Sequence, residues 1–249
     1  MDYDRTDIAA VYDKGRVLTP EAQRQTHQLL SAYVDPQPVS LVVDLGCGTG
    51  RFCQLLADHF GAAIIGIEPS ERMLDRARRK PLSARITLRR AHAEAVPLDD
   101  GCADLIFMSN VYHHFADPHR VARECRRVLR PGGYVCLRNG AHESDFPQRP
   151  FFPALQPLID AELPRRQDIT ANFAAAGFDL VGHEVVIQVV APDWASFVDK
   201  SATRADSFLA RIPDGDFDRG MAAMRAGDAA VDPDKPVTEE IDWFVFTRR

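Results

Sequence analysis

The sequence lacks the features that mark disulfide-rich, zinc-binding or membrane-spanning proteins. Its cysteines number five, an odd count, and none forms a C-x-x-C pair, so we expect neither a disulfide framework nor a zinc site. No stretch resembles a signal peptide, and no apolar run is long enough to span a bilayer. These absences predict a cytoplasmic protein, in a reducing compartment, with no membrane partner.

The sequence also lacks an excess of positive charge. Its 249 residues carry a formal net charge of −6, which gives the whole chain no attraction to nucleic acid or to anionic membranes. Arginines recur between residues 120 and 130, but they follow one predicted helix, where a solvated face is the more common meaning. The length suffices for a single α/β domain with additions.

The stretch LVVDLGCGTG is the most informative part of the chain. Leu41–Leu45 has the apolar, β-branched character of a buried parallel strand, and the glycines that follow it allow backbone N–H groups to approach a ligand. A dinucleotide-binding turn would need a glycine where the chain has Arg51, and a P-loop would need Lys and then Ser or Thr after its last glycine. The stretch follows instead the pattern D-x-G-x-G-x-G, beginning at Asp44.

Strands and helices alternate along most of the chain. Thr19, Ser70 and Asp117 each stand where a helix N-cap is expected, and Asp168 is expected to cap a later helix that ends at Gly177. The alternation predicts an α/β fold with a doubly wound, parallel sheet. Strands are expected at residues 41–45, 62–67, 86–88, 103–109, 134–138, 178–190 and 241–247.

Five segments stand out as motifs, in this order along the chain: DLGCGTG, GIEPS, AHAEAVPL, DLIFMSNVYHHF and LRPGGYV. Over residues 42–139 they resemble class I S-adenosylmethionine-dependent methyltransferases. The N-x-x-H-H-F loop that starts at Asn110 is similar to that of the family that includes the ubiquinone/menaquinone-biosynthesis methyltransferases. The resemblance implies S-adenosyl-L-methionine as cofactor and a mostly parallel, seven-stranded Rossmann-like sheet with an antiparallel last strand and helical additions.

The resemblance also implies roles for residues at the strand ends. Asp44 would meet the cofactor's ammonium, directly or through water, and Glu68 would accept hydrogen bonds from the ribose hydroxyls. The family usually has an acid where this chain has His92, so the bond to the adenine amino group is expected from His92, Ala93 or Glu94. The complete expected cofactor set is Asp44, Gly46, Cys47, Gly48, Glu68, Pro69, Met73, His92, Ala93, Glu94 and Asn110.

The expected acceptor is a small molecule methylated on O, N or C. A hydroxyl or protonated amine would need a base, for which His114 and His113 are the candidates, with Tyr12 as a positioning group in the leader at residues 7–13. A carbanion or thiolate acceptor would need no base. Two adjacent histidines are also found in metal sites. No further ligand cluster lies nearby in the sequence, however, so no metal is expected.

The later part of the chain is expected to serve the acceptor. Residues 141–167 are rich in proline and phenylalanine and too apolar for a linker. The stretch before the last strand is interpreted as a helical insertion, either a substrate cap, which we favour, or a dimer contact. We expect one domain over residues 1–249, with an N-terminal flap and helix (1–38), a cofactor-binding core (39–140), and a substrate-side half (141–249) containing the insertion (192–240).

Three alternatives stay open from the sequence. The protein could methylate RNA or protein, although its acidic balance disfavours RNA. It could use the same cofactor in a reaction other than methyl transfer. It could also bind S-adenosylmethionine without catalysis. Either a monomer or a homodimer is compatible with the sequence.

Overall fold

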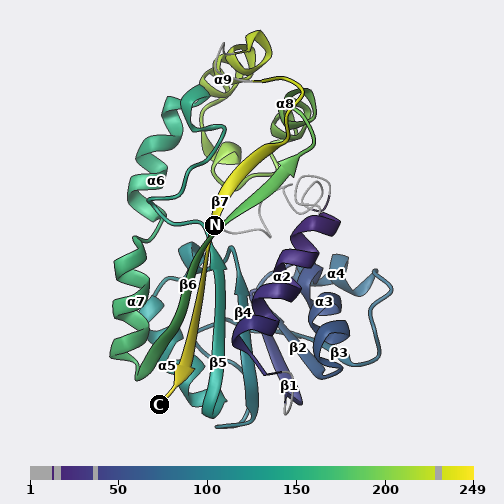
Figure 1. Ribbon diagram of the computed structural model, residues 1–249, viewed down its shortest axis with the longest axis vertical. Helices are drawn as coiled ribbons and strands as arrows, with labels where there is room; N and C mark the ends of the chain where they lie inside the picture. Colours follow the sequence, from purple (N-terminus) through teal and green to yellow (C-terminus); the bar gives the residue numbers. More distant parts are fainter. Residues whose placement is uncertain (1–12, 14–17, 36–38, 228–231) are drawn as a thin grey trace.

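The fold is an α/β sheet with helices on both faces (Figure 1). The computed structural model describes residues 13, 18–35, 39–227 and 232–249. Seven strands form one sheet in the order β3-β2-β1-β4-β5-β7-β6. The strands are β1 (Leu41–Leu45), β2 (Ala63–Glu68), β3 (Ile86–Arg90), β4 (Ala103–Ser109), β5 (Leu129–Asn139), β6 (Phe178–Ala191) and β7 (Val237–Arg248).

The pairing of the strands confirms the predicted fold class. β1 to β5 run parallel, whereas β7 is antiparallel to both β5 and β6. The strand order reverses between β1 and β4, which are neighbours in the sheet. In open α/β sheets, ligands bind beyond the carboxyl ends of the strands at this point of reversal.

Two layers of helices cover the sheet because neighbouring residues of each buried strand point to opposite faces. Val42 packs in a core with α2, α3 and α4, while Val43 packs in a second core with α5 and α7. The α-helices are α2 (Pro20–Tyr33), α3 (Arg51–Phe60), α4 (Glu71–Arg78), α5 (Pro118–Val128), α6 (Gln156–Glu162), α7 (Arg166–Ala175), α8 (Trp194–Ala202) and α9 (Asp214–Ala226).

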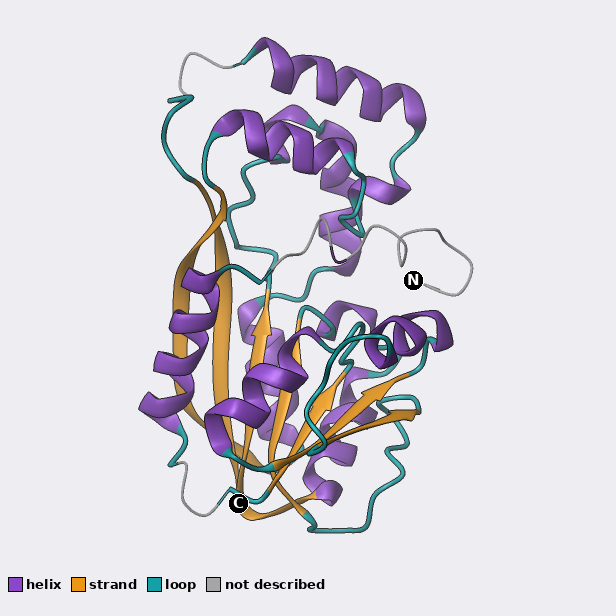
Figure 2. Cartoon of the chain, turned by 90° about the vertical axis from the view of Figure 1, so that its right-hand side faces the viewer, coloured by secondary structure: helices purple, strands orange, loops and turns teal. Residues whose placement is uncertain are grey.

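A third core joins the proline- and phenylalanine-rich run to the helices before β7. Phe152 and Ile159 of the run pack with Phe197 of α8 and Met221 of α9. Figure 2 shows this helical part above the carboxyl ends of the parallel strands. Short 3₁₀ helices complete the described elements: η2 (Tyr112–His114), η3 (Arg149–Phe151), η4 (Pro153–Leu155) and η5 (Leu209–Arg211).

Most expected element ends lie within two residues of those in the structure, but β5 begins at Leu129 rather than at residue 134, and one expected cap is wrong. The side chains of Thr19, Ser70 and Asp117 each accept a backbone N–H at a helix start. Asp168, by contrast, lies inside the first turn of α7, which begins two residues earlier, after Arg165. The helix starts early because Arg165 already has the extended backbone of an N-cap, so a side-chain cap is not required.

The last strand is longer than expected. It begins at Val237 rather than at residue 241, because β6 and β7 pair along nearly their whole lengths, up to Ala191 with Val237. No helix in the described part of the chain is long and apolar enough to cross a membrane.

A buried carboxylate fastens β7 to its surroundings. Asp242 has no exposed surface, and it accepts hydrogen bonds from Ser144 Oγ (2.9 Å) and Arg166 Nε (2.7 Å). His183 Nε2 of β6 lies 2.6 Å from the same carboxylate. A buried charge is tolerated when it is paired and hydrogen-bonded in this way. Asp242 thus connects both antiparallel strands to α7 and to the loop after β5.

We predict that Asp242→Asn lowers the free energy of unfolding by about 3 kcal/mol, because it leaves the Arg166 guanidinium without its buried counter-charge. Urea denaturation measures the change. The matched control is Asp218→Asn, at an exposed position of α9, which should stay within about 0.5 kcal/mol of the wild type. Equal changes for the two variants would contradict this account of Asp242.

Candidate active site

The turn after β1 has a backbone that requires glycine. Gly46, Gly48 and Gly50 have φ values of 76°, 54° and 71°, in the left-handed region that side chains disfavour. Gly46 N–H donates to the carbonyl of Ile67 at 2.8 Å, which fixes the turn to the end of β2. A Cβ atom on Gly46 would lie 2.3 Å from Val111 Cγ2. The absence of that Cβ therefore lets the loop after β4 pack directly on the turn.

Glu68 closes the turn from the side of β2. Its carboxylate is buried and accepts the backbone N–H groups of Gly48 and Ser70, each at 3.0 Å. Each carboxylate oxygen can accept more than one hydrogen bond. These two backbone N–H groups therefore hold the carboxylate beside the turn.

Asp44 lies under the turn at the end of β1. It is almost completely buried, and the Cys53 thiol donates to it at 3.1 Å. Burial raises the pKa of Asp44 to about 7, because the charged form loses its hydration. Hydrogen bonding to Cys53 lowers the pKa of the neighbouring Cys47 thiol, but burial and the nearby carboxyl groups of Asp44 and Glu68 together outweigh it and leave that pKa raised. Cys47 is therefore a protonated, packed residue of the turn rather than a reactive thiol.

A lysine that the sequence analysis did not single out holds the turn from the opposite side. Lys80 Nζ donates to the Thr49 carbonyl at 2.8 Å, to Thr49 Oγ1 at 3.0 Å and to Asp13 Oδ1 at 2.9 Å. Thr49 Oγ1 also donates to Asp13 at 2.6 Å. Asp13, the last residue of the leader at residues 7–13, is thereby joined to the glycine turn. Tyr12, its neighbour in the leader, lies outside the described residues.

The residues expected to meet adenine differ in their exposure. Met73 on α4 and Ala93 after β3 are buried, whereas His92 is exposed and Glu94 half-buried. The backbone after β3 is tied to the site because Ala91 N–H donates to the Glu68 carbonyl at 3.3 Å. Pro69, which follows Glu68, also belongs to the expected cofactor set. Its carbonyl accepts a hydrogen bond from Arg90 Nε at 3.0 Å.

The loop after β4 carries Asn110 and the histidine pair. Asn110 has φ 51°, unusual for a residue other than glycine, and its N–H donates to the Arg138 carbonyl at 2.7 Å. The rings of His113 and His114 lie 4.0 Å apart between centroids. Tyr112 N–H donates to Asn139 Oδ1 at 3.2 Å, which anchors the loop to the end of β5.

His114 is a weaker base than a free imidazole. Burial, and after it the neighbouring His113, lowers the pKa of His114 to about 2. His114 is therefore neutral at physiological pH and holds a proton weakly. It can accept a hydrogen bond from an acceptor group, but a base works best with a pKa near the working pH. No cluster of three or more His, Cys, Asp or Glu side chains suited to a metal was found in the described residues.

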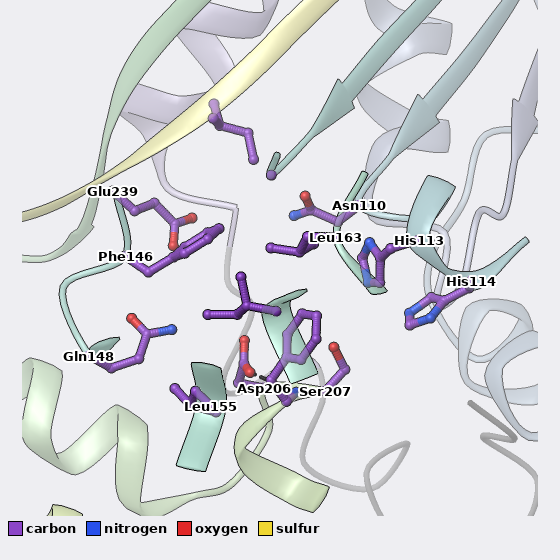
Figure 3. Close-up of a pocket in the computed structure, with 14 residues that line it drawn as sticks. Asn110, His113, His114, Phe146, Gln148, Leu155, Leu163, Asp206, Ser207 and Glu239 are labelled. Carbon is purple, nitrogen blue, oxygen red and sulfur yellow. Dashed lines mark hydrogen bonds between the residues drawn. The ribbon is translucent and has the colours of Figure 1, made fainter. Parts of the chain in front are cut away.

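A pocket opens beside this loop (Figure 3). It holds about 730 Å³ of space including its mouth, in the range of small-molecule sites. Asn110, His113 and His114 form one side, and the phenylalanine-rich run, the stretch before β7 and β7 itself form the others. The residues from those parts are Phe146, Gln148, Leu155, Ile159, Leu163, Asp206, Ser207, Phe208, Glu239 and Ile241, with Gly140 after β5.

Comparisons with known proteins agree with this geometry. The sheet is Rossmann-like, as in solved methyltransferase structures of similar fold, and residues 43–137 match the family model described as a methyltransferase domain. A sarcosine/dimethylglycine N-methyltransferase of Halorhodospira halochloris is 32% identical over 157 residues, which are 61% of this chain and 55% of that protein. A 27-O-demethylrifamycin SV methyltransferase of Amycolatopsis mediterranei is 26% identical over 200 residues, 74% of this chain and 71% of that protein.

A solved structure shares the fold over nearly the whole chain. Phosphoethanolamine N-methyltransferase 2 of Haemonchus contortus, in complex with S-adenosyl-L-methionine, superposes with a TM-score of 0.64 at 18% identity, covering 98% of this chain and 58% of that chain. The chain spans only 36% to 55% of the length of the first curated relatives it matches. Together the comparisons show that the chain is similar to methyltransferases, one of them solved with S-adenosyl-L-methionine, and none of them singles out the ubiquinone/menaquinone type.

We predict that S-adenosylhomocysteine binds more weakly as the pH falls from 7 to 5. The buried Asp44 carboxyl, with its pKa near 7, is increasingly protonated over this range, and a protonated carboxyl offers no charge to the ligand's ammonium. The expected loss is up to about tenfold in Kd per pH unit. Isothermal calorimetry between pH 5 and 8 measures it. Asp44→Asn should bind weakly with a flat pH profile, and an unchanged profile in that variant would contradict the assignment.

Proposed function

We propose that the protein is an S-adenosylmethionine-dependent methyltransferase that acts on a small-molecule acceptor. One observation carries the proposal: the glycine turn, Glu68 and the loop from Asn110 to His114 meet at the carboxyl ends of β1, β2 and β4, beside a closed-in pocket. This is where the order of the strands reverses and where such sheets bind ligands.

The strand ends have the chemistry to hold the cofactor. The backbone of residues 46–50 faces its amino-acid part, Asp44 its ammonium and Glu68 its ribose. Met73, Ala93 and their neighbours are the proposed adenine side. The other proposed contacts come from Gly46, Cys47, Gly48, Pro69, His92, Glu94 and Asn110.

The acceptor would occupy the pocket beside the histidines. Residues 206–208 of the stretch before β7 line that pocket, which supports a substrate cap rather than a dimer contact for residues 192–240. The two relatives described above, named for sarcosine/dimethylglycine and for 27-O-demethylrifamycin SV, support a small-molecule acceptor. Because residues 206–208 line this pocket, we retain the proposed division into a flap and helix (1–38), a cofactor-binding core (39–140) and a substrate-side half (141–249).

The cofactor supplies a methyl group on an already activated sulfonium, so the chain's contribution is alignment and the exclusion of water. Apolar side chains such as Leu155 and Leu163 keep the pocket dry. Neutral His114 would accept a hydrogen bond from the acceptor and orient it, with His113 beside it. We place the protein in the cytoplasm, since all five cysteines are free thiols.

We predict that Glu68→Ala weakens S-adenosylhomocysteine binding by roughly 30-fold, or about 2 kcal/mol, through the loss of hydrogen bonds to a charged acceptor. Calorimetry at pH 8 measures the effect. Glu68→Gln retains one acceptor oxygen, so its Kd should lie between those of the wild type and of Glu68→Ala. Glu71→Gln, an exposed acid three residues further on, is the matched control and should bind like the wild type.

A second measurement separates the rival functions. Release of S-adenosylhomocysteine from S-adenosylmethionine, screened over small amines, phenols and acids, should detect turnover with at least one compound class. Binding without turnover on any small molecule, together with turnover on RNA or protein, would contradict the small-molecule proposal. Failure to bind either cofactor form would overturn the methyltransferase proposal itself.

A further inference from the structure

One carboxylate in the acceptor pocket is not explained by the cofactor or by the fold. Glu239, on β7, is half-buried and lines the pocket. The structure gives its carboxylate no hydrogen bond or ion pair with any of the described residues. A partly desolvated carboxylate facing apolar side chains is costly unless a cation or a donor compensates for its lost hydration.

The pocket wall includes neutral donors such as Gln148 and Ser207, but neither donates to Glu239 in this structure. No lysine or arginine is among the described residues that line it, and its second acid, Asp206, already accepts the N–H groups of Phe208 (2.8 Å) and Leu209 (3.1 Å). Lys200 lines an adjoining smaller pocket with Glu239, and its ammonium donates to the Val190 carbonyl at 3.2 Å. Within the described residues, no ion pair is formed by the Glu239 carboxylate, so this side of the pocket is acidic.

The surroundings of Glu239 suit a cation with an apolar body. Phe146 also lines the pocket, and its ring is held against Gly140, whose missing Cβ would lie 3.0 Å from Phe146 Cζ. Aromatic faces attract alkylammonium groups, and attract them more strongly away from water. Leucine and isoleucine side chains complete the wall between this side and the histidines.

We propose that the pocket binds acceptors that carry a cationic nitrogen on an apolar body, with the nitrogen at Glu239. This inference rests on the proposed function. Figure 3 shows Glu239 and His113 on opposite sides of the pocket, and His113 belongs to the loop that packs on the glycine turn. The nitrogen at Glu239 is therefore a recognition group, and the methylated atom is a different atom, near the histidines.

The test uses three probes of one shape: 4-phenylbutylamine, 4-phenylbutanol and 4-phenylbutyrate. Their Kd values for the full-length protein saturated with S-adenosylhomocysteine are measured at pH 7 by ligand-observed NMR. We expect the amine to bind at least tenfold more tightly than the alcohol, and the acid more weakly than both. Glu239→Gln should remove the amine's advantage and leave the alcohol unchanged, while Asp218→Asn, which removes an exposed charge on α9, should change nothing.

Three results would overturn the inference: equal affinity for the three probes, preference for the acid, or equal losses for amine and alcohol in Glu239→Gln. No binding of the amine to the wild type would do the same. Calorimetry with S-adenosylhomocysteine alone is run first. Its failure would count against the proposed function, whereas normal cofactor binding with a wrong probe preference counts only against the role of Glu239.

Discussion

The site depends on one close contact, between Gly46 and Val111. A side chain at position 46 would occupy the space of the Val111 methyl groups, 2.3 Å away, and the positive φ of Gly46 disfavours any side chain there. Because the contact exists, the loop after β4 lies on the turn after β1. The proposed methyl donor and the acceptor pocket are thereby brought to opposite sides of one short loop.

Two buried carboxyl groups and one half-buried lysine then surround the turn. Glu68 binds the N–H of Gly48, Lys80 binds the carbonyl of Thr49, and Asp44 lies beneath with a raised pKa. Rigid, preorganised donors and acceptors suit an enzyme whose contribution is alignment. The raised pKa of the buried Asp44 is also the reason for the pH dependence predicted for cofactor binding.

The sequence predicted the part of the fold in which local signals agree. β1, β4 and α3 have the predicted ends because apolar runs there are bounded by glycines or polar residues. The contacts of Lys80 and the proposed role of Glu239 could not be predicted, because Lys80 bonds to Thr49 and Glu239 lines a pocket built from parts far away in the chain. Asp168 was mistaken for a cap because its side chain suits one, although the backbone at Arg165 starts α7 earlier. The pocket likewise exists only after residues 206–208 fold over the phenylalanine-rich run.

The most direct test of the central claim is a crystal structure of the protein with S-adenosylhomocysteine. The account predicts both ribose hydroxyls within hydrogen-bond distance of Glu68, the amino-acid part against residues 46–50, and the sulfur facing the pocket at His113. A ligand bound elsewhere, or bound at the turn with its sulfur directed away from that pocket, would contradict it.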